Sequence, residues 1–127
     1  MSDELKMESI LTSMKKMLGG VMGESTDVFD TDLIIHINSI FMILHQIGVG
    51  PEKHYTIKDA SNTWGEFIAD RIDIESVKTY MYLKLKLVFD PPTSSFVLTS
   101  YENQIKELEW RLNVQVENHP NGGAENV

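Results

Sequence analysis

The segment Asp73-Ile-Glu-Ser-Val-Lys-Thr-Tyr-Met-Tyr-Leu-Lys-Leu-Lys-Leu-Val-Phe89 decides the fold class, because two structures compete for it. Its inner part, Leu83–Leu87, alternates leucine with lysine as a half-buried strand does. The whole segment is seventeen residues long, however, which exceeds the usual strand. A continuous stripe at helical spacing also runs along it, made of Ile74, Val77, Met81, Leu85 and Val88. The segment therefore predicts a helix over 73–89 and a mainly helical protein.

This predicted helix and the one before it are apolar on more than one side. Tyr80, Leu83 and Leu87 form a second, narrower stripe on 73–89. The segment 31–47 carries one broad apolar stripe, made of Leu33, Ile37, Ile40, Phe41, Leu44 and Ile47. Ile35 and Met42 project from its opposite side. A helix with two apolar sides either lies at the centre of a domain or contacts a second molecule.

Two further amphipathic segments complete a small bundle of four main helices. The first covers about 5–18 and is terminated by Gly19-Gly20; its apolar face consists of Met7, Ile10, Leu11, Met14, Met17 and Leu18. The last covers about 95–113 and is capped within Thr93–Ser95; its apolar face consists of Val97, Leu98, Tyr101, Ile105, Leu108 and Leu112.

The remaining segments lack a clear period. Near 55–69 we expect an extended piece at Tyr55–Ile57 or a short helix with Trp64 and Phe67, capped by Ser61 or Asn62. Beyond Val116 the chain has almost nothing to bury. The sequence therefore predicts a single helical domain over 1–116 and a flexible, disordered C-terminal tail over 117–127.

Composition narrows the function. The chain has 127 residues, no cysteine and a net charge of −8, from 11 basic and 19 acidic side chains. The lack of cysteine excludes thiol nucleophiles and disulfide scaffolds. The acidic balance argues against an autonomous binder of duplex DNA, which needs clustered cations. The acidic start and the lack of an apolar run of about 20 residues predict neither a signal peptide nor a membrane span.

No catalytic or metal-binding constellation is recognisable. His36 and His45 lie nine residues apart, on opposite sides of one predicted helix, so they cannot share an ion. His54 falls in a loop and His119 in the tail. The acidic clusters stand at helix starts, where the helix dipole favours negative charge. We therefore expect no enzyme activity, no cofactor and no metal.

Apolar surface at helical spacing is what a small monomer leaves unexplained. Phe96, Asn103 and Trp110 recur every seven residues, opposite the main stripe of the last helix. Another element of the same domain covers them, or a second subunit does; the sequence leaves both open. The candidate interface residues are Ile35, Met42, Tyr80, Phe96 and Trp110.

Several stretches resemble a known family. They are Phe29–Asn38, Gln46–Pro51, Val77–Phe96 and Glu107–Leu112. Together, over roughly residues 7–116, they resemble the head-tail connector, or head-completion adaptor, proteins of tailed bacteriophages. The resemblance implies a helical fold without enzymatic activity, located at the head-tail junction of the virion and in the host cytoplasm during assembly.

The same resemblance implies the partners. These are further copies of the chain in a ring, for which twelvefold symmetry on the portal is one candidate, the phage portal protein, and a downstream neck, stopper or tail protein. Genomic DNA would only pass through, and a ring of net-negative subunits would adhere to it weakly. The alternative is a small phage-encoded interaction or regulatory protein that acts on a protein partner as a monomer or dimer.

Overall fold

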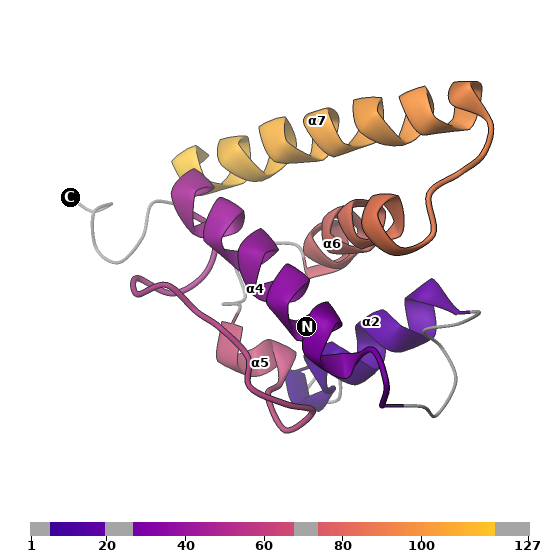
Figure 1. The fold of residues 1–127 in the computed structure, drawn as a ribbon. Coiled ribbons are helices and arrows are strands. Elements are labelled where there is room, and N and C mark those ends of the chain that lie inside the picture. The colour runs from indigo at the N-terminus through magenta and orange to yellow at the C-terminus, as the bar shows by residue number, and fades with distance from the viewer. Residues whose placement is uncertain (1–5, 20–26, 68–73, 119–127) are drawn as a thin grey trace.

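The computed structural model describes residues 6–19, 27–67 and 74–118. They form helices α2 (Ile10–Leu18), α4 (Asp30–Ile47), α5 (Trp64–Phe67), α6 (Ile74–Phe89) and α7 (Ser95–Asn118) (Figure 1). No strand occurs among these residues, and one isolated bridge joins Ser9 to Thr63. The prediction of a mainly helical fold is confirmed. Within the described ranges, no helix combines the length and apolar character that a membrane crossing requires.

Helix α6 lies at the centre and contacts α2, α4 and α7 (Figure 1). Most of both predicted stripes is covered; the buried residues are Ile74, Val77, Tyr80, Met81, Leu83 and Leu85. Val88, placed in the main stripe by its spacing, is exposed instead, because the last turn packs through Leu87 and Phe89. The helix is therefore central, and the strand alternative is wrong for this segment.

Helix α4 follows the sequence prediction closely at both ends. Asp30 and Asp32 lie in its first turn, where the positive end of the helix dipole stabilises their negative charge. At its end Gly48 takes φ 100°, and its amide donates to the carbonyl groups of Leu44 and His45. The broad stripe centred on Ile37 is buried, so the opposite side of α4 faces outward.

Helix α2 is shorter than the predicted helix 5–18. The break falls at Ser9, whose backbone is extended and whose hydroxyl accepts from the amide of Thr12 at 3.1 Å. Two backbone hydrogen bonds join this point to residues 62–64. The amide of Trp64 donates to the carbonyl of Glu8, and the amide of Ile10 donates to the carbonyl of Asn62. These bonds come from residues more than fifty positions away, so local periodicity does not reveal them.

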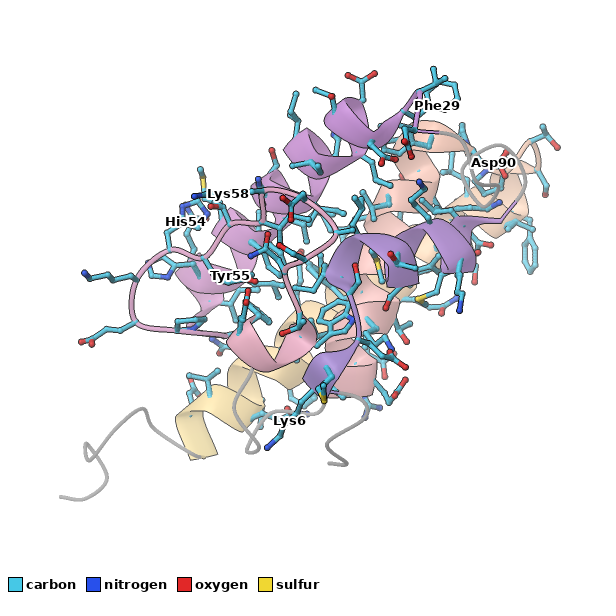
Figure 2. The ribbon with its side chains drawn as sticks, turned by 90° about the horizontal axis from the view of Figure 1, so that it is seen from below. Lys6, Phe29, His54, Tyr55, Lys58 and Asp90 are labelled. Atoms are coloured by element: carbon cyan, nitrogen blue, oxygen red, sulfur yellow. The ribbon has the colours of Figure 1, made fainter. Side chains whose placement is uncertain are left out.

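Of the two elements that the sequence left open between α4 and α6, the structure contains the short helix, α5, whereas Tyr55–Ile57 form no strand. Ile57 is fixed by Asn38, which accepts from the amide of Ile57 at 2.8 Å and donates to its carbonyl at 3.0 Å. Figure 2 shows the loop with His54, Tyr55 and Lys58 running alongside α4. Helix α5 buries Trp64 in the core.

The predicted cap of α5 is wrong. The carbonyl of Thr63 accepts from the amide of Glu66 at 3.1 Å. Asn62 does not cap this helix through its oxygen, which instead accepts from the amides of Lys58 and Asp59 and so closes the preceding turn.

Helix α7 folds back across α6 and is longer than predicted. Its start is capped at Ser94, as expected. It continues past 113 to Asn118, because its last turns pack on the end of α4: Val116 lies against Gly48, and the side-chain amide of Asn113 donates to the carbonyl of Ile47 at 3.4 Å. The first two residues of the predicted tail are therefore helical. The rest, 119–127, lies outside the described residues.

Candidate protein interface

Two of the candidate interface residues lie on the outward side of α4. Ile35 is 56% exposed and Met42 is 49% exposed. They are seven residues apart, about 10.5 Å along a helix, and point away from the buried stripe of α4. Both side chains are therefore far more exposed than the core residues in the described part of the chain.

Two others lie on the outward side of α7. Phe96 is 82% exposed and Trp110 is 66% exposed. Figure 1 shows α7 along one edge of the molecule, with no other helix outside it. Of the two explanations that the sequence leaves open, cover by another described element of the same domain is therefore wrong for this face. Two large exposed aromatic side chains on one helix face are typical of a contact surface.

Tyr80 does not belong to this surface. It is fully buried between α6 and α7, and its hydroxyl donates to a carboxylate oxygen of Glu109 at 2.7 Å. Burial, and then the hydrogen bond to Glu109, raise the pKa of the Tyr80 hydroxyl well above its usual value. The spacing that placed Tyr80 on a second apolar side is correct, but that side faces α7.

One exposed apolar residue near the surface was missed. Val28 is largely exposed, and it precedes Ile35 by the same seven residues that separate Ile35 from Met42. That spacing was available in the sequence. It was overlooked because Val28 precedes the helix start.

The lysines of α6 are engaged within the fold. Lys78 lies 3.3 Å from Glu8 and stacks over Trp64, Lys84 stacks over Tyr80, and Lys86 pairs with Asp90 at 2.6 Å. The hydrogen bond that Lys86 donates to Asp90 is also the main cause that raises the pKa of Lys86. These cations therefore do not form a free basic patch.

The side chains that could bind a metal or act in catalysis do not gather in one site within the described residues. His36 packs edge-on against Phe89, and His45 lies 5.9 Å from His54 between ring centroids. Within the described ranges no three histidine, aspartate or glutamate side chains gather as a metal site would require. A pocket of about 240 Å³ beside α2 is lined by the carboxylate of Glu8, by hydroxyl groups of Ser9, Thr12 and Ser13, and by Lys16 and Lys78. Its one carboxylate is already paired with Lys78 at 3.3 Å.

These observations define a small helical protein that exposes large apolar side chains on two helices, a feature typical of protein contact surfaces. Residues 10–119 match the family described as phage connector protein, and the chain belongs to this family. It is thus a structural component of a bacteriophage virion, of a non-enzymatic kind, that interacts with other virion proteins. Comparison with curated proteins and with solved structures gave no match.

Proposed function

We propose that this connector assembles as a ring beneath the portal and joins the DNA-filled head to the neck, stopper or tail component. It would act at the head-tail junction, assemble in the host cytoplasm and catalyse no reaction. Twelvefold symmetry, matched to the portal, is the arrangement to be tested first.

The exposed apolar side chains carry this proposal. Ile35 and Met42 are exposed on α4, and Phe96 and Trp110 are exposed on α7, so the apolar side chains form two separate surfaces on two helices. A subunit that associates through two different surfaces forms a head-to-tail contact, which closes into a ring when the rotation between neighbours permits it. A single patch that pairs with itself would stop at a dimer.

The charge of the chain fits a channel through which DNA passes. A net charge of −8 gives each subunit no general affinity for phosphate. The α6 lysines that would grip DNA contact groups of their own subunit instead. We therefore expect the assembled protein not to retain duplex DNA at physiological salt.

The test is light scattering of the purified protein over a concentration series, alone and with the portal protein of the same phage. The proposal expects ring-sized species or capture on the portal. Phe96→Ser with Trp110→Ser should abolish both, while the free energy of unfolding stays within about 0.5 kcal/mol, because these side chains are exposed. Val88→Ser is the matched control, since it also removes an exposed apolar side chain.

A stable monomer that ignores the portal would contradict the proposal. That result would favour the alternative, an interaction protein that acts on a different protein partner. Portal capture that survives the double substitution would retain the connector role and move its contact surface elsewhere.

A further inference from the structure

We propose that the outward face of α7 packs antiparallel against the outward face of α4 in a second copy of this chain. The inference rests on the proposed ring, and it specifies which two surfaces meet. We call the α7 stripe of Phe96, Asn103, Lys106 and Trp110 the aromatic face, and the stripe of Val28, Asp32, Ile35 and Met42 the aliphatic face.

The two faces have the same length and the same order of side chains. Phe96 to Lys106 and Asp32 to Met42 are each ten residues, about 15 Å along a helix. In an antiparallel arrangement Met42 therefore meets Phe96 when Asp32 meets Lys106. The same register brings Ile35 to Asn103, and it brings Trp110 to the start of α4, next to the turn that contains Val28.

Charge supports this register. Asp32 and Lys106 are exposed, and neither makes an ion pair within the described part of the chain. Asp32 is the only charged member of its face, whereas on α7 the carboxylate of Glu107 also lies beside Asn103 and Trp110. On α7 the other cation, Arg111, is already paired with Glu107 at 2.7 Å. Opposite charges at matched positions select one orientation of two packed helices and disfavour the others.

Competing arrangements leave apolar side chains uncovered or keep Asp32 away from Lys106. A parallel pairing that keeps Asp32 on Lys106 places Met42 beyond Glu109 and leaves Phe96 without a partner on α4. A pairing of two aromatic faces brings Phe96 to Trp110 but leaves Ile35 and Met42 exposed. A parallel pairing that sets Met42 on Trp110 and Ile35 on Asn103 also covers apolar side chains, but it places Asp32 opposite Ser100. Only the antiparallel contact between the two different faces both covers the large apolar members and brings Asp32 to Lys106.

The position of the two helices makes the contact repeat. Figure 1 shows α7 along one edge of the molecule, and Figure 2 shows α4 along another. A copy that uses its aromatic face on one neighbour therefore keeps its aliphatic face free for the next. This continuation is what a closed ring requires.

Engineered cysteines provide the test, because the full chain has none of its own. Protein with Ile35→Cys is mixed with protein with Asn103→Cys under mild oxidation, alone and on portal particles. A disulfide needs the two Cβ atoms within about 3.5–4.5 Å, so only facing positions react efficiently. We expect the mixed dimer to exceed that from Met7→Cys with Asn103→Cys at least about tenfold; Met7 is a matched control, also exposed but outside both faces.

A second measurement separates charge from folding effects. Asp32→Lys and Lys106→Glu should each weaken self-association about 5- to 10-fold, which is the cost of one like-charge contact, and the double variant should regain most of that loss. Thermal melts of the dilute proteins verify that each variant is folded.

The outcomes distinguish the inference from the function beneath it. If wild-type protein assembles or binds the portal but Ile35→Cys with Asn103→Cys reacts no better than the Met7 control, the inference is overturned and the connector role stands. Efficient self-reaction of Asn103→Cys alone would show that two aromatic faces pair, and would also overturn it. If the wild type neither self-associates nor binds the portal, both proposals fall.

Discussion

At the scale of single residues, Tyr80 joins the central helix to α7. Its ring is buried, and its hydroxyl donates to the partly exposed carboxylate of Glu109 at 2.7 Å. A hydrogen bond to a charged acceptor is stronger than one between neutral groups. This contact therefore adds to the burial of Ile105 and Leu112 in holding α7, with its exposed Phe96 and Trp110, against the core.

Tyr80→Phe should lower the free energy of unfolding by about 1–2 kcal/mol, because it removes a partly buried hydrogen bond to a carboxylate without leaving a cavity. Urea unfolding followed by circular dichroism measures the change. Tyr101→Phe is the matched control on α7, with an expected change below about 0.5 kcal/mol. Equal losses in the two variants would show that the Tyr80 hydrogen bond contributes nothing specific.

Tyr80 also makes stability depend on alkaline pH. Its pKa is raised in the folded protein, first by burial and then by Glu109, whereas in the unfolded chain it is near the ordinary value of about 10. Above that pH the unfolded chain releases a proton that the folded protein retains, so stability is lost as the pH rises. Urea unfolding from about pH 8 to about pH 11 should show this decline, with a shallower slope in Tyr80→Phe. Identical slopes in both proteins would contradict the assignment.

At the scale of elements, the turn after α4 depends on glycine. Gly50 has φ 103°, and a Cβ atom there would lie 2.5 Å from Cε1 of Phe67. Gly19 at the end of α2 also has a positive φ, of 58°, but a Cβ there would meet nothing within 4 Å. The two positions therefore separate backbone strain from a steric clash.

Gly50→Ala should destabilise the protein by about 2–4 kcal/mol, the sum of left-handed backbone strain and overpacking against Phe67. Gly19→Ala should cost about 1–3 kcal/mol from backbone strain alone, because its φ of 58° and ψ of −161° lie in a region that glycine almost alone adopts. Chemical unfolding of both variants tests the difference. A Gly19→Ala loss as large as that of Gly50→Ala would mean that the contact with Phe67 yields without cost.

The helices that local patterns predicted best are those whose ends are set locally. α4 begins at acidic residues and ends at Gly48, and the sequence displays both signals. The start of α2 and the end of α7 were wrong for the opposite reason. Backbone hydrogen bonds from residues 62–64 interrupt the predicted first helix at Ser9, and packing of Val116 on Gly48 extends α7 beyond 113. Neither contact leaves a periodic trace in the sequence.

At the scale of the whole molecule, the position of a residue around its helix predicted which side chains are exposed. It did not predict which element covers a buried side chain. Phe96 and Trp110 lie opposite the core stripe of α7, and they are exposed as that position requires. Tyr80 was grouped with them because α6 is apolar on two sides. Its cover comes from α7, and only the arrangement of the helices decides whether a second apolar side meets a helix of the same chain or another molecule.

Self-association should strengthen as salt is added. Each subunit carries a net charge of −8, so neighbours in an assembly repel one another, and the attraction comes mainly from apolar side chains that salt does not weaken. The proposed contact of Asp32 with Lys106 is one exposed pair, which contributes about 0.2–1 kcal/mol and opposes this trend only slightly. Between about 50 mM and about 300 mM sodium chloride the Debye length falls from about 14 Å to about 6 Å, and the repulsion is screened. Sedimentation across this range should show a several-fold rise in the association constant, with a steeper rise in the Lys106→Glu variant, whose subunits carry more negative charge. An association that weakens with salt would mean that ion pairs, and not the exposed apolar side chains, hold the subunits together.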